Sequence, residues 1–473
     1  YTYNHNLSLT QKNDNSNYFI SIGYTEVGGY FVNEDYNRWN ARINIDNSVT
    51  DWLDVGIQTF MTSTDLSGYQ MDLNLRYDNW YAPAYDANGK LVDSPVGSGN
   101  NSYYFMQADD LNKRIYFFGN PYAEIKFPFL KGLSFKTNFN INYRTTSQYS
   151  FQSWANGFLG LGSKDETRQT SWTNDNILSY KRTFNKNHKV DVTMLYGVEK
   201  RAHTATTAAA SNFPSHELGY NRLQSGDASL QKAVSNAWEE ASLYSMGRLF
   251  YSYRNKYMIT GTIRRDGFTG FSEKNKFGIF PSMALGWVIS EEPFFKNNLN
   301  WFDYLKIRAT YGANGNRTIG RYQTLATVDG GYNYVNGGVP IYTQSISGLA
   351  SPNLKWETTT GTNIGIDFSF IKQRLNGSIE YYNNNTFDLL YNVDIPSISR
   401  YSTFPTNLGK IHNHGVEISL NSVNIEKKNF TWNSGVIFSL NRNELKELLG
   451  KDTNGDGIED DLVSEQLFIG EPL

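Results

Sequence analysis

The chain has 473 residues and no cysteine, and it combines 15% aromatic residues with only 19% charged and 39% hydrophobic ones. Globular proteins usually carry about 25% charged and 45–50% apolar residues, so this chain is polar without being highly charged. A net charge of −3 provides no basic surface, and we therefore expect no nucleic-acid partner. The lack of cysteine excludes disulfides, thiolate catalysis and cysteine-ligated metals. No window approaches the ~20 apolar residues of a membrane-spanning helix, whereas the strands of a membrane β-barrel average out as weakly hydrophobic.

Alternation with a period of two residues dominates the sequence. From Leu133 to Arg144 the odd positions are mostly apolar, as at Phe139 and Ile141, and the even positions are polar, as at Lys136. Such alternation predicts strands with one apolar and one polar face. Similar runs predict about sixteen strands, many near the ~10 residues that cross a bilayer at a tilt. They span 3–11, 17–25, 36–46, 52–62, 114–126, 132–148, 168–182, 188–201, 240–254, 257–265, 276–290, 303–311, 355–370, 374–383, 414–422 and 430–441. Only Asn443–Leu449 has the pattern of a short amphipathic helix.

The connections between these strands alternate in length. The links after odd-numbered strands are short, as at 12–16 and 46–51, and those after even-numbered strands are usually longer, as at 63–113 and 312–354. Other long connections are predicted at 149–167, 202–239 and 384–413. Short turns at one end and long loops at the other are typical of outer-membrane barrels, whose long loops face outside. A soluble sandwich gives no reason for loop length to follow strand parity.

Strand parity also bears on the two ends of the chain. The first strand starts at the end that carries the long loops, whereas bacterial barrels have an even number of strands and periplasmic turns. With both termini expected inside, an odd number of strands should be missing at each end. We therefore expect residues 1–473 to form one barrel domain that is truncated at both ends.

Two neighbouring segments carry a family resemblance. Residues 351–359 read SPNLKWETT and residues 363–368 read NIGIDF, and they closely resemble the NPNLKWE and NIGLDF signature of SusC/RagA-type TonB-dependent outer-membrane transporters. Other segments resemble the same family in the same order. They are Arg265–Gly267, Phe280–Ser282, Leu285–Trp287, Leu305–Arg308, Tyr311–Asn316, Arg374–Leu390 and Asn407–Ile411.

The resemblance implies an all-β fold, a large antiparallel transmembrane β-barrel of about 22 strands, of which about sixteen lie in this chain. It implies a plug domain and a TonB-contacting region that no position of this sequence matches. The implied function is TonB-dependent import of a nutrient across the bacterial outer membrane, most often an oligosaccharide and in some branches a peptide. A SusD-like surface lipoprotein would close over the long loops as a lid. No required cofactor and no enzymatic activity are implied.

The segment from Asp452 to Asp461 reads DTNGDGIEDD and suits a calcium loop. Asp452, Asn454, Asp456 and Asp460 supply oxygen ligands at positions 1, 3, 5 and 9, and Gly457 at position 6 allows the sharp turn. Position 12, where a bidentate glutamate belongs, is Val463. The sequence therefore predicts a possible Ca²⁺ site, and the alternative is an acidic, solvated turn.

Aromatic clusters in the long loops are candidate substrate contacts, because aromatic rings stack on sugar faces and pack against peptides. An alternative is that these rings pack the loops against one another or belong to the aromatic girdles at the membrane interfaces. The candidates are Trp80, Tyr81, Tyr85, Tyr103, Tyr104, Phe105, Tyr332 and Tyr334.

Charged residues on the polar faces of the predicted strands would line a wet interior or touch a plug. They are Lys136, Arg144, Arg248, Arg264, Arg308 and Asp367.

Catalysis is not predicted, because adjacent carboxylates such as Glu239 and Glu240 point to opposite faces of a strand and no Ser/His/Asp grouping is evident. Two alternatives to a transporter are an outer-membrane barrel enzyme and a soluble all-β glycan-binding or adhesin module. The first would need a catalytic group, and the second would leave the loop-length pattern unexplained.

Overall fold

The computed structural model divides into two compact units. Unit 1 comprises Tyr1–Pro128, Lys136–Asn176 and Val198–Ala241, and unit 2 comprises Phe129–Phe135, Ile177–Gly197 and Ser242–Leu473. The structure describes residues 1–29, 35–68, 81–92, 101, 109–155, 158–299, 301–399, 401–450, 452, 455, 457 and 459–472. Within these ranges, no helix is long and apolar enough to cross a membrane.

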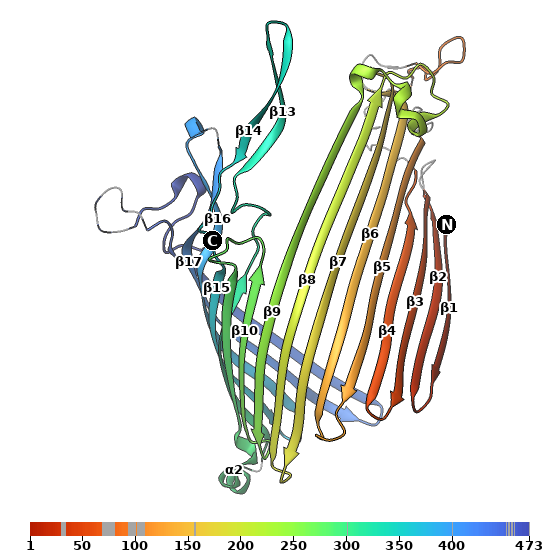
Figure 1. Ribbon diagram of the computed structural model, residues 1–473. Helices are drawn as coiled ribbons and strands as arrows, with labels where there is room; N and C mark the ends of the chain where they lie inside the picture. Colours follow the sequence, from red (N-terminus) through yellow and green to blue (C-terminus); the bar gives the residue numbers. More distant parts are fainter. Residues whose placement is uncertain are drawn as a thin grey trace. The chain divides into compact units, whose positions relative to one another are not determined.

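One antiparallel sheet of 16 strands contains nearly all of the regular structure (Figure 1). Hydrogen-bonded neighbours follow the chain order, except that β12 pairs with β15. The strands are β1 (Thr2–Lys12), β2 (Ser16–Gly28), β3 (Asp35–Thr50), β4 (Leu53–Asp65), β5 (Asp109–Lys126), β6 (Leu133–Ala155), β7 (Phe158–Phe184), β8 (His188–Ser211), β9 (Lys232–Tyr253), β10 (Tyr257–Phe268), β11 (Phe277–Val288), β12 (Phe302–Asn316), β15 (Glu357–Phe370), β16 (Leu375–Asp394), β17 (Thr403–Lys427) and β18 (Phe430–Glu447).

Strands with the two-residue alternation present one apolar and one polar face. In β10, Tyr257, Ile259 and Ile263 are exposed on the apolar face, whereas Thr260 and Arg264 lie half-buried on the opposite, polar face. Side chains of adjacent strand residues point to opposite sides of a sheet, so the two-residue period of the sequence becomes two chemically different surfaces. All sixteen predicted strands are confirmed in type and order.

Several strands are longer than predicted at the end that carries the long loops. The predicted connection at 149–167 is almost wholly strand, because β6 and β7 together leave only 156–157 between them, and that at 202–239 shortens to 212–231, because β8 continues to Ser211 and β9 begins at Lys232. Residues 202–211 read AHTATTAAAS, in which half of the residues are alanine and no strict alternation of apolar and polar side chains appears. Ala210, near the end of this segment, is buried beside Phe151 and Phe213, so the segment packs through small side chains and its sequence gives no two-residue period.

The connections still separate into two ends of the sheet. At the turn end the connections are short, with 51–52 among the shortest and 127–132 the longest apart from 289–301. At the loop end they include 66–108, 212–231 and 317–356. The predicted relation between loop length and strand parity is therefore confirmed for these three connections. It fails for 289–301 at the turn end and for 29–34 and 156–157 at the loop end, and the predicted long connection 384–413 shortens to 395–402.

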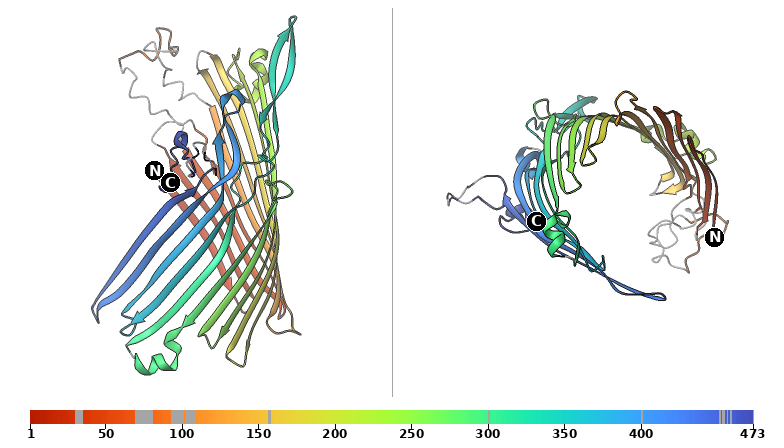
Figure 2. Two further views of the ribbon diagram at one scale, coloured as in Figure 1. Left: turned by 90° about the vertical axis from the view of Figure 1, so that its left-hand side faces the viewer. Right: turned by 90° about the horizontal axis from the view of Figure 1, so that it is seen from below.

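Two elements of the connections were not predicted. Helix α2 (Pro293–Asn298) lies at the turn end, and the hairpin of β13 (Thr327–Asn336) and β14 (Val339–Gly348) extends from the loop end of the same unit (Figures 1 and 2). The predicted helix at Asn443–Leu449 is wrong, because β18 continues to Glu447. Leu445 is buried opposite Ile411, and the backbone of Leu445 is hydrogen-bonded to Gly470 and Glu471 as well.

A buried carboxylate ties the connection after β11 to the turn end of β10. Glu292 precedes α2, and its side chain accepts hydrogen bonds from the Tyr257 hydroxyl and, at 3.2 Å, from the Trp287 indole. The Lys256 ammonium forms an ion pair with it at 3.2 Å. These donors stabilise the ionised form, so the pKa of Glu292 lies below its usual range.

We predict that acid loosens this connection. A carboxylate with a lowered pKa stabilises the fold above its unfolded pKa of about 4.3, and that stabilisation is lost as the pH falls through the folded value. Hydrogen exchange, corrected for intrinsic rates, should show the amides of Phe295 to Leu299 losing protection between pH 7 and pH 3. Glu292→Gln should reduce protection already at pH 7 and remove the pH step. Glu291→Gln is the matched control, because Glu291 is half-exposed and pairs with Lys296 on the surface. Equal pH profiles of the two variants would contradict the assignment.

Candidate functional site

A polar cleft of about 340 Å³ opens at the loop end of unit 2. Its walls come from the segment after β12, from the base of the β13–β14 hairpin and from the connection between β16 and β17. Most of the side chains that line it carry hydroxyls, amides or phenol rings. Arg321 is the one charged side chain among the described residues of its lining. The principal side chains are Arg321, Tyr322, Gln323, Ser347, Asn392 and Tyr401.

Local backbone bonds shape the cleft. Tyr322 has a φ of +62°, a left-handed conformation that a bulky residue rarely adopts. The strain is held in place because the Tyr322 carbonyl accepts from Leu325 N–H at 2.9 Å, and the Gln323 carbonyl accepts from Ser351 N–H at 3.1 Å. The Tyr322 ring is 42% exposed as a result. Residues other than glycine that have a left-handed backbone conformation cluster at functional sites, so Tyr322 is a candidate ligand contact.

An aromatic cluster lies beneath the loop end of unit 2. Leu354 and Trp356 pack against phenylalanines of β10, β11 and their connection, and Leu354 is only 1% exposed. The Trp356 indole also donates to the Lys276 carbonyl at 3.3 Å. The cluster consists of Phe268, Phe271, Phe280, Leu354 and Trp356. These residues of the signature segment therefore have a structural role.

The neighbouring signature residues tie four strands together. The Glu357 carboxylate accepts from the Asn316 amide and from Leu390 N–H, each at 3.1 Å. The Asn407 side chain accepts from Lys355 N–H and donates to the Lys355 carbonyl, each at 2.8 Å. These bonds link the loop ends of β12, β15, β16 and β17.

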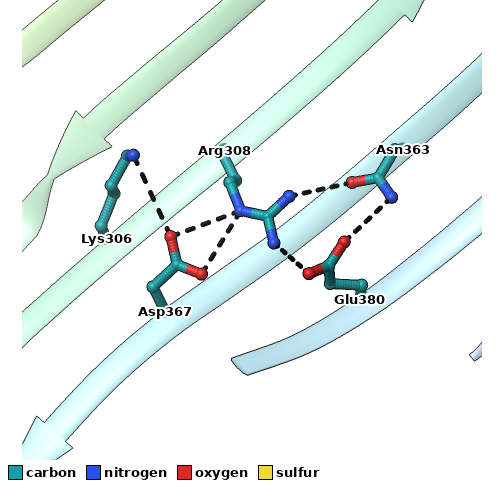
Figure 3. A network of polar contacts seen from close by, with 5 residues as sticks. All are labelled: Lys306, Arg308, Asn363, Asp367 and Glu380. Atoms are coloured by element: carbon teal, nitrogen blue, oxygen red, sulfur yellow. Dashed lines mark hydrogen bonds and ion pairs between the residues drawn. The ribbon is translucent and has the colours of Figure 1, made fainter. Parts of the chain in front are cut away.

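A charged network crosses the polar face of β12, β15 and β16 (Figure 3). The Arg308 guanidinium donates to both carboxylate oxygens of Asp367 at 3.3 Å and forms an ion pair with Glu380. Asn363 accepts from Arg308 at 3.3 Å and donates to Glu380 at 3.2 Å, while Lys306 lies 4.0 Å from Asp367. Arg308, Asp367 and Glu380 are each about one-quarter exposed. The predicted placement of Arg308 and Asp367 on the polar face is confirmed, and the structure adds Glu380 as their partner.

Few of the predicted aromatic contacts lie among the described residues. Trp80, Tyr103, Tyr104 and Phe105 lie outside the described residues, and for Tyr332 only the backbone, in β13, is described. Tyr81 is 97% exposed and Tyr85 46% exposed in unit 1, and Tyr334 is 54% exposed on the hairpin of unit 2. Their substrate contacts remain predictions.

The tyrosines of the cleft do not follow from the sequence. Tyr322 and Tyr401 are isolated aromatics in two connections 79 positions apart, so composition does not join them. The Gly320–Arg321–Tyr322 sequence gives no signal for the left-handed conformation of the tyrosine.

The acidic loop after β18 is described in part. Asp452 accepts hydrogen bonds from the N–H groups of Gly455, at 2.6 Å, and Gly457, at 2.9 Å. Glu459 accepts from Leu448 N–H at 2.9 Å. Asn454 and Asp456 lie outside the described residues, so the geometry of the predicted calcium ligands is untested. In the described part of the chain, no three His, Asp or Glu residues are grouped as a metal site.

We predict that Arg308 stabilises the sheet through its two carboxylate partners. Arg308→Met should lower the free energy of unfolding by about 1–3 kcal/mol, because it leaves Asp367 and Glu380 without their shared donor. The measurement is the temperature at which the folded form disappears in heat-modifiable gel mobility. Lys306→Met, on the same strand and face, is the control and should have a smaller effect, since its ammonium lies 4.0 Å from Asp367. The assignment is wrong if both variants melt alike.

Comparison with known proteins identifies this architecture. The family model described as TonB dependent receptor-like, beta-barrel matches residues 55–466. TonB-dependent receptor P3 of Formosa agariphila is 31% identical over 464 residues, which cover 94% of this chain and 46% of that protein. TonB-dependent receptor SusC of Bacteroides thetaiotaomicron is 28% identical, with 95% of this chain and 47% of that protein covered. The chain thus spans about half the length of the curated relatives it matches.

Solved structures agree on the fold. A chain of the RagAB peptide transporter superposes with a TM-score of 0.80 at 23% identity, covering 95% of this chain and 51% of that one. The outer membrane transporter YddB of Escherichia coli superposes with a TM-score of 0.54 at 12% identity, covering 94% of this chain and 55% of that one. The match of the family model over most of the sequence and the 16-stranded antiparallel sheet lead to one conclusion. The chain belongs to the TonB-dependent receptor-like β-barrel family.

Proposed function

We propose that the complete protein imports a nutrient across the bacterial outer membrane with energy supplied through TonB, and that residues 1–473 form part of its barrel domain. The observation that carries the proposal is the family match over residues 55–466. Family membership places the chain in the outer membrane, so the apolar face meets lipid and the polar face lines the interior. The barrel provides a passage, and no covalent bond of the nutrient is made or broken.

An oligosaccharide is the proposed substrate class. The cleft offers hydroxyls, amides and two tyrosines, which suit hydrogen bonding and ring stacking with a sugar. A peptide is the second candidate, because the structurally similar RagAB is described as a peptide transporter. The two candidates differ in charge, since a peptide presents ionised termini that would call for partners beyond Arg321.

A SusD-like surface lipoprotein is the proposed partner. The β13–β14 hairpin exposes apolar side chains on a two-stranded sheet that pairs with no other described strand. Tyr342 is 82% exposed, Val335 68% and Val339 62%. Isolated two-stranded hairpins are marginal in water, and an exposed apolar surface of this kind marks a contact with another protein. A lid over the loop end would cover it.

We predict that cells producing the full-length protein take up an oligosaccharide that cells lacking it do not. Tyr401→Ala should raise the concentration for half-maximal uptake about tenfold, because it removes an aromatic contact in the cleft. Tyr381→Ala, on the apolar face of β16, is the matched control and should leave uptake unchanged.

Three outcomes distinguish the alternatives. Recovery of the intact oligosaccharide in the periplasm supports transport, and cleavage by the purified protein would instead identify an enzyme. Uptake of peptides only would correct the substrate class. Co-purification of a lipoprotein, and its loss when 327–348 is replaced by a short turn, tests the partner separately from the substrate.

We further propose that the segment from Asp452 to Asp460 binds Ca²⁺. The described N–H···Oδ bonds from Gly455 and Gly457 to Asp452 support the tight turn that such a loop requires. Equilibrium dialysis should find about one Ca²⁺ per chain with a dissociation constant of about 0.1–1 mM, as in extracellular modules. Asp452→Asn combined with Asp456→Asn should abolish the binding, whereas Glu426→Gln at the opposite end of the sheet should not. Unchanged binding in the double variant would place the ion elsewhere.

A further inference from the structure

The apolar face of unit 2 is hollowed by a groove of about 580 Å³ across β8 to β11. Gly247 and Gly261 form part of its floor, and Met194, Leu249, Ile263 and Met283 surround them. A Cβ at Gly261 would meet no heavy atom within 4 Å, and one at Gly247 would meet only Ile263 Cγ2 at 3.9 Å. The surface is therefore open where two side chains are missing.

Hydrocarbon is the solvent of this groove. The groove side chains share the face of Tyr257 and Ile259, which meets lipid in a barrel of this family. Met194 is 57% exposed, Ile263 57% and Met283 46%. Flexible methionine side chains can adjust to an irregular apolar partner. Water gains no hydrogen bonds in such a hollow, so an apolar chain is the occupant that fits it.

The aromatic residues near the turn end indicate how deep in the bilayer the groove lies. Tyr253, Tyr257 and Trp287 are neighbours across β9, β10 and β11, with successive ring centroids 6.4 Å apart. Such a row of Tyr and Trp marks a membrane–water interface. Gly261 lies four residues further along β10, or about 13 Å along the strand. With strand tilt, that distance stays within one leaflet of a ~30 Å hydrocarbon core.

Positively charged side chains lie at the headgroup level of the same leaflet. Arg254, in the turn between β9 and β10, is exposed, and its guanidinium lies 5.1 Å from the centroid of the Tyr253 ring. The backbone N–H of Arg254 donates to the Asn187 carbonyl at 2.7 Å. The neighbouring turn, which carries the exposed Lys186, is therefore in contact with the turn of Arg254. Neither cation has a carboxylate partner in the described part of the structure. A phosphate group complements this pair of charges.

We propose that a glycerophospholipid of the periplasmic leaflet binds here, with its phosphate at Arg254 and one acyl chain in the groove over Gly261. The turn end faces the periplasm in this family, so the site lies in the periplasmic leaflet, which consists of phospholipids. The site is on the outside of the barrel wall and is independent of the nutrient, so it stands whether or not the proposed transport is correct.

Native mass spectrometry of the full-length protein tests this site, with delipidated protein titrated with phosphatidylglycerol. Gly261→Leu should weaken binding about tenfold, because the new side chain occupies the space of the acyl chain. Ala41→Leu places the same side chain on the apolar face of β3, outside the groove, and should bind as the unmodified protein does. Arg254→Gln should weaken phosphatidylglycerol about tenfold, and Lys428→Gln, in another turn at the same end, should not.

Two outcomes overturn the proposal. Equal affinity of the Gly261→Leu and Ala41→Leu variants would show that the groove holds no lipid chain. A dimer of the unmodified protein that Gly261→Leu converts to a monomer, with phosphatidylglycerol binding unchanged, would identify the groove as a protein interface. Heat-modifiable mobility confirms that each variant is folded, which the open space around Gly261 favours.

Discussion

The loop end of unit 2 depends on the burial of Leu354 and Trp356. The chain leaves the sheet after β12, forms the hairpin and returns at β15, and these two side chains fix its return against Phe268, Phe271 and Phe280. Burying a large apolar side chain contributes about 1.5–3 kcal/mol, and the bonds of Glu357 and Asn407 add direction to that non-directional term. The cleft is built from segments on both sides of this anchor, so its shape follows from the same contacts.

The polar face shows how the wall can hold charge without losing stability. Arg308 lies across Gly365, whose missing side chain leaves room: a Cβ there would be 2.7 Å from the Arg308 Cζ atom. The glycine of the NIGIDF segment thus permits the guanidinium to reach Asp367 on one side and Glu380 on the other. Partly exposed groups lose less hydration than buried ones, and a shared cation serves two carboxylates. The low average hydrophobicity of the chain reflects this second surface.

Sequence patterns predict what is periodic, and they miss what is irregular. Sixteen strands follow from alternation, because each spans two different environments. The β13–β14 hairpin does not follow from it, since Gly330, Gly331, Gly337 and Gly338 interrupt the pattern and both faces lack a core. The signature residues identify a family, yet only the structure shows that Trp356 is 8% exposed and supports the loops. The cleft joins Tyr322 to Tyr401 through tertiary contacts, for which a single sequence carries no signal.

Glycines within the strands separate structural demands from binding demands. A glycine in a strand interior costs about 0.5–1 kcal/mol relative to alanine. At Gly365 the Arg308 network occupies the vacated space and offsets that cost. At Gly261 no described atom lies within 4 Å of the position of a Cβ, and in the proposed site the opening lies at acyl-chain depth beside a cationic turn. In the site proposed here, the acyl chain of a phospholipid fills that space and acts as the packing partner of this part of the sheet.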